Sequence, residues 1–304
     1  MSLKENLRKL FTDAGACAVG FSAACEVEEY ESAGFRRFLS EGRHADMSYL
    51  ERNASLRNDP RTLLEGARTV ISLAFSYWPG SAAAQASPVA LYALGRDYHK
   101  ALRSALKPVC RAIEAGYGCQ TRICVDSAPI AERYWAYRAG LGVKGLNGCL
   151  IIPGKGSYVV LAEVLTTLAV EADRAIAGDC GRCGSCMRAC PTGALSESGL
   201  DARKCLSYLT IEHKGMWPKD IAAGESLFGC DRCQKTCPHN RHPEKARLQD
   251  FLPRGEVLSL TAGLCLELSD SDYSELTRGS ALARAGASGL RRNAAAALGI
   301  EQYD

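Results

Sequence analysis

The chain has 304 residues, of which 47% are hydrophobic and 23% charged, which is the composition of an ordinary globular protein. This length is enough for one large domain or two ordinary ones, so core burial is not limiting. The formal net charge of +3 excludes a strongly basic coat, but a local basic patch could still hold an anionic partner.

The N-terminal stretch predicts an amphipathic helix rather than a targeting segment. Leu3, Leu7, Leu10 and Phe11 share one face of this helix, and charges interrupt it throughout, so it contains no apolar core of a signal peptide. No uninterrupted apolar run approaches the length needed to cross a bilayer. We therefore expect a cytoplasmic protein with no membrane partner. In a reducing compartment, fifteen cysteines indicate metal binding or redox work rather than structural disulfides.

Residues 1–172 are predicted to be a mixed domain of helices and strands. Runs of β-branched and aromatic residues predict strands over 69–78, 120–127 and 156–168. Apolar residues at helical spacing predict a helix over 96–116 that stops at Gly116. A second helix is expected over 128–142, with Pro129 near its first turn and Gly140 past its end.

The rest of the chain is predicted to contain a small metal-binding module and a tail. Residues 173–245 have little apolar core of their own, so bound clusters are expected to supply the folding energy. Residues 246–304 are expected to form a short helical segment. The predicted fold class is therefore α+β: an α/β-type N-terminal domain, a ferredoxin-like module and a short helical tail.

The cysteines of the module follow the spacing of ferredoxin iron–sulfur ligands. Cys180, Cys183, Cys186 and Cys190 form a C-x2-C-x2-C-x3-C run followed by Pro191, in which three close cysteines hold one [4Fe–4S] cluster and the fourth points to another. Structural zinc sites usually pair two knuckles separated by a dozen or more residues, and three thiolates in seven residues suit a cubane better.

A second, incomplete run supplies the other cluster. Residues 230–238 form a C-x2-C-x3-C-P run that lacks its first cysteine, which Cys205 can supply. The crossed assignment places Cys180, Cys183, Cys186 and Cys237 on one cluster, and Cys190, Cys205, Cys230 and Cys233 on the other. The other seven cysteines lie among apolar neighbours and are interpreted as small buried hydrophobes: Cys17, Cys25, Cys110, Cys119, Cys124, Cys149 and Cys265.

Asp126 is the candidate general acid of the N-terminal half. It ends a predicted strand, and a carboxylate that faces a cleft there can have its pKa raised by poor solvation. The alternative is a helix N-cap aspartate. The glycine-rich stretch 140–156 predicts close backbone approach to something flat or large, and it does not match a dinucleotide-binding motif.

Several linked motifs resemble epoxyqueuosine reductases. They are DSAP…ER…RAGLG, the eight-cysteine arrangement, CLSYLTIEHKG, FGCD.CQ..CP.N and GLRRNAAAALG. The resemblance implies a tRNA-modifying enzyme that uses cobalamin and two [4Fe–4S] clusters to reduce the epoxide of epoxyqueuosine to the alkene. Because no DxHxxG run is present, we expect the cobalt to lack a protein histidine ligand.

The resemblance also implies roles for individual residues. Asp126 matches the proton donor, and residues 1–172 would form the cobalamin-binding domain. The residues that match cofactor-binding positions are Arg57, Tyr98, Asp126, Leu150, Leu161, Ser207 and Lys214. Tyr98 and the two leucines could equally belong to the core.

The chain departs from the family in two ways. Leu146 stands where a lysine is expected, which removes one positive charge, and the chain resembles a short form without the full C-terminal helical-repeat domain. Because the corresponding region contacts tRNA in the family, the candidate phosphate contacts are Arg284, Arg291, Arg292 and Asn293, with a solvated helix end as the alternative.

Three other functions remain open on the sequence. They are a corrinoid and iron–sulfur reductase of another substrate, similar to reductive dehalogenases, a plain ferredoxin-type electron carrier, and a corrinoid-handling protein. The absence of an export signal and the presence of Asp126 disfavour the first, and the long N-terminal domain disfavours the second. The expected partners are tRNA carrying epoxyqueuosine and an electron donor of flavodoxin or ferredoxin type, and we expect a monomer.

Overall fold

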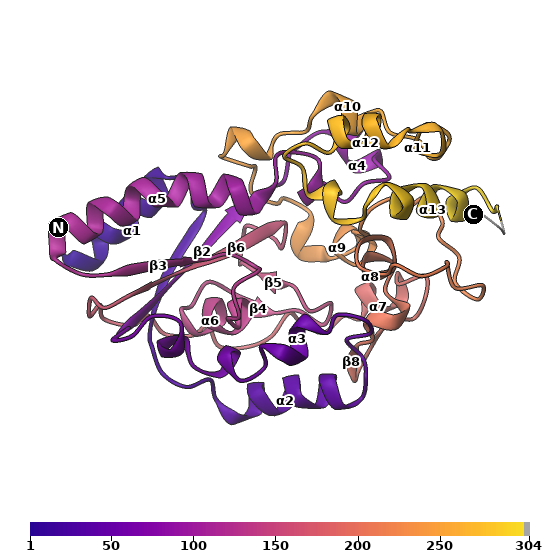
Figure 1. Cartoon of the computed structure of the whole chain (residues 1–304). Coiled ribbons are helices and arrows are strands. Elements are labelled where there is room, and N and C mark those ends of the chain that lie inside the picture. The colour runs from indigo at the N-terminus through magenta and orange to yellow at the C-terminus, as the bar shows by residue number, and fades with distance from the viewer. Residues whose placement is uncertain (301–304) are drawn as a thin grey trace.

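The computed structural model describes residues 1–300, and a four-stranded antiparallel sheet organises its N-terminal half (Figure 1). The strand order is β1–β2–β6–β3, with bounds Ala18–Ala23, Thr69–Ser76, Val159–Thr166 and Thr121–Cys124. β2 pairs with β6 along its full length, whereas β3 pairs only with Glu163–Thr166. β3 therefore leaves the edge of β6 over Val159–Ala162 without a paired strand. After Cys124, the last residue of β3, the chain leaves the sheet and continues to Asp126.

Helices cover both faces of this sheet. α1 (Leu3–Asp13) and α5 (Tyr98–Tyr117) lie on one face, and α6 (Glu132–Arg138) lies on the other (Figure 1). Alternation along the strands sends Phe21 and Leu73 toward α1 and α5, and Val70 toward α6. Because both faces are covered, every residue of β2 is buried, which explains its continuous apolar sequence.

The predicted strands and helices are present, with different ends. All three predicted strands form, each shorter than its predicted range. The helix predicted over 96–116 is α5. It does not stop at Gly116 but continues to Tyr117, and Gly118 ends it with a left-handed φ of 62°. The helix predicted over 128–142 is α6. It begins only at Glu132, so Pro129 lies in the preceding loop rather than in its first turn. Gly140 does follow the end of this helix, with φ 73°.

Short elements complete the chain. The N-terminal half also contains α2 (Glu29–Ser40), α3 (Tyr49–Arg52), α4 (Ala82–Ala86) and the small hairpin of β4 (Val143–Lys144) and β5 (Leu150–Ile151). The cysteine-rich part contains α7 (Ser185–Arg188), β7 (Leu195–Ser196), β8 (Gly199–Leu200), α8 (Leu206–Ile211) and α9 (Arg232–Lys235). The last part contains α10 (Gly255–Leu258), α11 (Ala262–Glu267), α12 (Asp270–Leu276) and α13 (Ala287–Ala297). Single 3-10 turns lie at Leu56–Asn58, Pro60–Thr62, Leu91–Ala93, Ala202–Lys204, Pro238–Asn240, Gln249–Phe251 and Ala281–Arg284.

One continuous apolar core joins the three predicted segments. Phe75 and Leu102 of the N-terminal half, Phe228 of the cysteine-rich part, and Val257 and Leu290 of the last part all belong to it. The cysteine-rich part and the tail therefore pack against the sheet domain, and the division at residues 172 and 245 stays a prediction. The α+β fold class is confirmed. No helix within residues 1–300 combines the length and apolar character that a bilayer crossing requires.

Candidate active site

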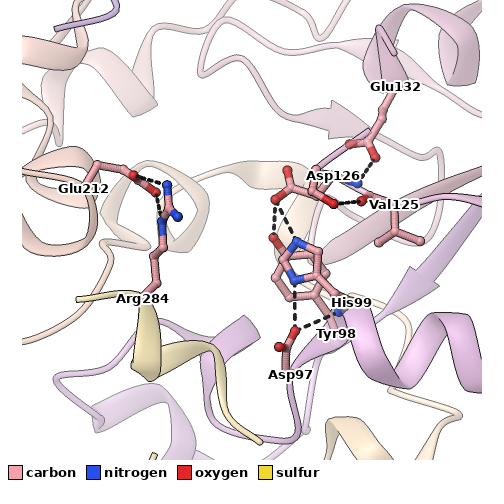
Figure 2. A network of polar contacts seen from close by, with 9 residues as sticks. Asp97, Tyr98, His99, Val125, Asp126, Glu132, Glu212 and Arg284 are labelled. Carbon is pink, nitrogen blue, oxygen red and sulfur yellow. Dashed lines mark hydrogen bonds and ion pairs between the residues drawn. The ribbon is translucent and has the colours of Figure 1, made fainter. Parts of the chain in front are cut away.

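Asp126 lies in the loop between β3 and α6, where its carboxylate is accessible. Its side chain is 56% exposed, and its backbone has a φ of 45°, an unusual value for a residue other than glycine. The backbone N–H donates to Glu132 Oε1 at 2.6 Å (Figure 2). Aspartate adopts this left-handed region more readily than most residues, and such positions are frequent at active sites.

Two donors from the start of α5 converge on the carboxylate of Asp126. Tyr98 Oη donates to Asp126 Oδ2 at 2.8 Å, and His99 Nε2 lies 3.1 Å from the same oxygen (Figure 2). On the other side of the imidazole, His99 Nδ1 lies 2.9 Å from Asp97 Oδ1, which also caps the helix by accepting the His99 backbone N–H. Since both ring nitrogens face carboxylate oxygens, His99 is best satisfied as an imidazolium that donates in both directions.

The electrostatics of these groups agree with this proton arrangement. Burial lowers the pKa of His99, but hydrogen bonds to Asp126 and Asp97 outweigh it and raise the pKa above 6.5. Partial burial raises the pKa of Asp126, but the hydrogen bonds from His99 and Tyr98 outweigh it and keep the pKa below 3.8. Burial and the charge of Asp126 raise the pKa of Tyr98. The proton of the pair therefore rests on His99, next to an ionised Asp126.

Two further carboxyl groups lie behind Asp126. Burial, and then the charge of Asp126, raise the pKa of Glu132. Glu163 on β6 is fully buried, and neither of its carboxyl oxygens has a hydrogen-bond partner within residues 1–300. Burial and the neighbouring Glu132 raise the pKa of Glu163 well above 4.5, so this side chain is neutral. Two carboxyl groups with raised pKa values, Glu132 and Glu163, thus lie beneath the loop of Asp126.

Arg57 and the open edge of β6 border the same region. The guanidinium of Arg57 stacks 5.0 Å from the ring centroid of Phe35, and it makes no hydrogen bond or ion pair within residues 1–300. Burial and the nearby Arg133 lower the pKa of Arg57, and Glu132 and Asp126 act in the opposite direction. Leu161 lies on the part of β6 that β3 leaves uncovered. An unpaired guanidinium and free backbone groups fit the polar periphery of a flat cofactor.

The side chains of the two predicted leucines belong to the core. Leu150 is 3% exposed and Leu161 is 9% exposed, and both pack with Ala136 of α6. Their side chains stabilise the layer under α6, so any cofactor contact would come from the backbone.

Four cysteines of the crossed assignment surround one cavity. Cys180, Cys183, Cys186 and Cys237 line it together with the β4–β5 loop and Pro238. Burial raises the pKa of the Cys237 thiol, and the nearby thiols of Cys183, Cys186 and Cys180 raise it further. Within residues 1–300, no three His, Cys, Asp or Glu side chains converge closely enough to hold a single metal ion. A cavity walled by four thiols suits a larger inorganic group than one ion.

The other four cysteines also lie near one another. Burial raises the pKa of Cys205 and of Cys230, with smaller contributions from Cys190 on the former and from Cys205 on the latter. Burial raises the pKa of Cys233, to which Cys149, Cys230 and Cys205 add. None of the fifteen cysteines, all of which lie within residues 1–300, forms a disulfide. The grouping agrees with the crossed ligand sets, which remain our assignment.

The segment around α8 is tied to the C-terminal part. Ser207 lies in the first turn of α8, just after Cys205. Lys214 Nζ donates to the carbonyls of Ile211, Arg284 and Ala285 at 3.3, 2.8 and 2.9 Å. With all three ammonium hydrogens occupied, Lys214 acts as a tether between these segments, and a cofactor contact would require these bonds to break.

The structure corrects two of the predicted tRNA contacts. Asn293 is fully buried, and its amide donates to the carbonyls of Thr210 and Leu227, so it has no N–H left for a phosphate. Arg292 donates to the carbonyls of Leu209, His213 and Gly215, which stabilises the C-terminal end of α8. Asn293 was misread as a surface group because helical spacing alone does not show which face is covered, whereas Arg292 is partly buried and is committed to these three carbonyls.

The remaining two arginines are closer to the surface. Arg284 forms a bidentate pair with Glu212 (Figure 2), with distances of 3.0 and 2.7 Å. Its side chain is 57% exposed. Arg291 donates to Leu268 O and to Asp270, both at 2.8 Å, and is 21% exposed. Arg284 is therefore the most accessible of the four predicted tRNA contacts.

Sequence reasoning missed His99, Glu132 and Glu163. His99 directly follows Tyr98 and stands two residues after an aspartate that can cap a helix, and this spacing was a usable signal. Glu163 is the only charged residue in the apolar strand 156–168, where period-two alternation places it on a covered face.

Comparison with known proteins agrees with the Asp126 site and with the two cysteine sets. Residues 57–127 match the family model described as "Epoxyqueuosine reductase QueG, DUF1730", and residues 179–240 match the 4Fe-4S double cluster binding domain. The epoxyqueuosine reductase of Gloeobacter violaceus is 40% identical over 292 residues, covering 92% of this chain and 91% of that protein. The Escherichia coli enzyme is 38% identical, covering 88% of this chain and 73% of that protein.

Solved structures give the same result. An epoxyqueuosine reductase crystallised with an epoxyqueuosine-modified tRNA-Tyr stem loop superposes with a TM-score of 0.87 at 29% identity, covering 98% of this chain and 81% of that chain. The Bacillus subtilis enzyme, in a structure with its catalytic aspartate loop swung out of the active site, has a TM-score of 0.86 at 28% identity with the same coverage. On this sequence identity, coverage and structural similarity, the chain belongs to the epoxyqueuosine reductase family.

Proposed function

We propose that the chain reduces the epoxide of epoxyqueuosine in tRNA to the alkene of queuosine. The reaction consumes two electrons and two protons and releases water. The cofactors are cobalamin and two [4Fe–4S] clusters, and when bound they supply a strong cobalt nucleophile or single electrons. The observation that carries the proposal is the exposed carboxylate of Asp126, held by Tyr98 and His99, in a chain of this family.

The residues of the site supply protons to the oxygen that leaves the epoxide carbon. When substrate covers the site, loss of water around Asp126 favours its neutral form. His99 Nε2 then transfers its proton to Asp126 Oδ2, and Asp126 passes a proton to the alkoxide oxygen. Tyr98 keeps the carboxylate oriented during this transfer, and Asp97 keeps the imidazole in place.

We assign cofactor binding to the residues that fit it. Arg57 offers an unpaired guanidinium to an anionic or amide group of cobalamin, and the backbone of Leu161 is available on the uncovered edge of β6. Tyr98 and Asp126 would face the cofactor from the α5 side. Ser207 and Leu150 remain weaker candidates, because the former has no distinguishing contact and the latter is committed to the β4–β5 pair.

We further propose that electrons enter through the cluster held by Cys180, Cys183, Cys186 and Cys237. Cys183 is the exposed member of this set, so a small redox protein of flavodoxin or ferredoxin type could approach the cluster closely. Among the predicted tRNA contacts, Arg284 and Arg291 are retained. Arg284 could exchange Glu212 for a phosphate of the anticodon stem loop.

The test is a direct assay of the loaded protein. Protein reconstituted anaerobically with both clusters and cobalamin is incubated with epoxyqueuosine-bearing tRNA and a low-potential reductant, and the nucleosides are identified by mass spectrometry. We expect loss of one oxygen atom from the modified nucleoside. Absence of product from fully loaded protein would overturn the substrate assignment.

The matched control is Asp126→Asn, which keeps the shape of the side chain but not its acid. We expect this variant to retain both clusters and cobalamin by absorption spectroscopy and to lose about 100- to 10,000-fold in turnover. Full activity in this variant would remove Asp126 from the mechanism while leaving the substrate assignment intact.

A further inference from the structure

The loop between β4 and β5 covers the cavity of the first cysteine set. Leu146, Asn147 and Ile151 line this cavity together with the four cysteines. The loop is folded tightly, because Gly145 N–H donates to Cys149 O at 2.8 Å and Gly148 N–H donates to Gly145 O at 2.9 Å. It therefore presents a fixed set of side chains to whatever occupies the cavity.

Asn147 is the polar side chain of this loop that is not fully satisfied. It is 8% exposed, and its Oδ1 accepts the backbone N–H of Cys149 at 3.1 Å. Its Nδ2 is buried and has no hydrogen-bond partner within residues 1–300. A buried amide without a partner is destabilising by about 1–3 kcal/mol, so a native loop is expected to offer this nitrogen an acceptor.

The hydrogen bond from the Cys149 N–H fixes the orientation of the Asn147 amide. If the amide were turned over, its NH₂ group would face the N–H of Cys149, donor against donor. A Cβ at Gly145 would lie 2.5 Å from Asn147 Oδ1, so the absence of a side chain at position 145 lets the amide adopt this pose. The oxygen of this side chain is thus anchored and its nitrogen is free, in the wall of the cavity that the four thiols also line.

We propose that Asn147 Nδ2 donates a hydrogen bond to a sulfur of the [4Fe–4S] cluster held by Cys180, Cys183, Cys186 and Cys237, and that this bond raises the reduction potential of that cluster. The inference rests on this ligand assignment. Thiolate and sulfide sulfurs are the acceptors that the cavity would offer, and reduction adds negative charge to them. A donor N–H therefore stabilises the reduced cluster more than the oxidised one.

The consequence concerns the direction of electron flow. A cluster near the surface that receives electrons must be reducible by an external donor. A hydrogen bond that raises its potential makes this first reduction easier. Asn147 is in this view a positioning and tuning residue, which acts through the cluster and not on the substrate.

The test is a redox titration of reduced clusters followed by electron paramagnetic resonance, with the variant Asn147→Leu. Leucine has nearly the same shape but no N–H. We expect the variant to retain the iron of both clusters, with the potential of one cluster shifted to more negative values and the other unchanged. The readout requires neither cobalamin nor tRNA, so its outcome is independent of the proposed reductase activity.

Leu146→Ala is the matched control, since Leu146 lines the same cavity and has no donor. We expect its potential to stay unchanged or to become less negative, because a smaller side chain admits water to the cluster. An unchanged or more positive potential in Asn147→Leu overturns the proposal, and so does an equal negative shift in Leu146→Ala.

A measurement on the unsubstituted protein decides the case in which Asn147→Leu does not assemble the cluster. Protein labelled with ¹⁵N in asparagine side chains is reduced, and hyperfine coupling between the label and the cluster is sought by electron–nuclear double resonance. Asn240 is the labelled asparagine near Cys237 in sequence, but it donates both amide hydrogens to Ser157 Oγ and Gln234 O and so has none left for the cluster. Coupling supports the bond from Asn147, and absence of any coupling overturns it.

Discussion

Replacement of His99 by phenylalanine tests the proton supply of the site. The imidazole stacks on Tyr98 with ring centroids 4.1 Å apart, and phenylalanine preserves this stacking while it removes both N–H groups. At 3.1 Å between His99 Nε2 and Asp126 Oδ2, Coulomb attraction is ~1 kcal/mol with the dielectric of water and ~5 kcal/mol with that of a protein surface. Asp126 is 56% exposed and His99 31% exposed, so we take the lower part, about 1–2 kcal/mol.

This energy holds the proton on His99, so it opposes the transfer to Asp126 and does not itself measure a rate. Because His99→Phe lacks the group that passes a proton to Asp126, we expect a loss of about 100-fold in the rate of epoxide reduction. The pH dependence carries more information. The groups that face His99 are Asp97 and Asp126, and both favour its charged form, so its pKa lies above 6.5. In the unsubstituted enzyme, single-turnover activity should therefore fall as pH rises through this raised pKa, because the imidazolium loses its proton.

In His99→Phe this descending limb should disappear, and activity should depend on the acid form of Asp126 at lower pH. Tyr98→Phe is the matched control, since it removes one hydrogen bond to the same oxygen without changing the charge. It should lower the rate while the limb remains. The reasoning is refuted if His99→Phe shows the same limb and the same rate as the unsubstituted enzyme.

Three further outcomes follow from the geometry. Cys205→Ala should lower the bound iron by about half, because it removes a ligand of one of two equal clusters, and unchanged iron would contradict the crossed assignment. Glu163→Gln should become progressively more stable than the unsubstituted protein as pH rises above 4.5. The folded state holds a proton on Glu163 that the unfolded chain releases, and the difference grows by up to about 1.4 kcal/mol per pH unit until the raised pKa is reached. Thermal unfolding of both proteins from pH 5 to pH 8 measures this, and parallel curves would show that Glu163 is ionised or bonded. Arg292→Met should lower the thermal stability, since it frees the carbonyls of Leu209 in α8 and of His213 and Gly215 just after it, without weakening tRNA binding. A loss of tRNA affinity in folded protein would restore Arg292 as an RNA contact.

The cysteine spacing was informative because iron–sulfur ligation is a local requirement. Three ligands within seven residues specify a loop that wraps one inorganic group, and the cavity lined by Cys180, Cys183 and Cys186 has this form. The partner Cys237 is remote in sequence, and only the rule that the last cysteine of such a run serves the other cluster predicted it. The strands were predictable for a similar reason, since β-branched runs reflect burial on both faces of a sheet.

The errors arose where the tertiary environment decides the role of a polar residue. Asn293 and Arg292 stand in a segment with a basic appearance, but the carbonyls at the end of α8 bind them, and no local pattern reports that α8 lies there. His99 and Glu163 were missed because their partners are Asp126 and Glu132, which come from different elements. Gly116 was taken as the residue that stops α5 in place of Gly118 because the two glycines are equally good helix stops by type, and only the second adopts a left-handed φ.

Two consecutive residues of α6 connect the loop of Asp126 with the loop that covers the first cysteine set. Glu132 accepts the backbone N–H of Asp126 at 2.6 Å, and Arg133 donates to the carbonyl of Gly148 at 2.6 Å, in the loop that covers the first cysteine set. The acid and this cluster cavity are therefore attached to one helical turn, which is itself packed on the sheet. Under the proposed function, a rigid link of this kind would fix the distance between the proton donor and the cluster. This is a physical reason for the Glu-Arg pair in the motif that first suggested the family: the pair acts through geometry, and neither side chain needs to touch the substrate.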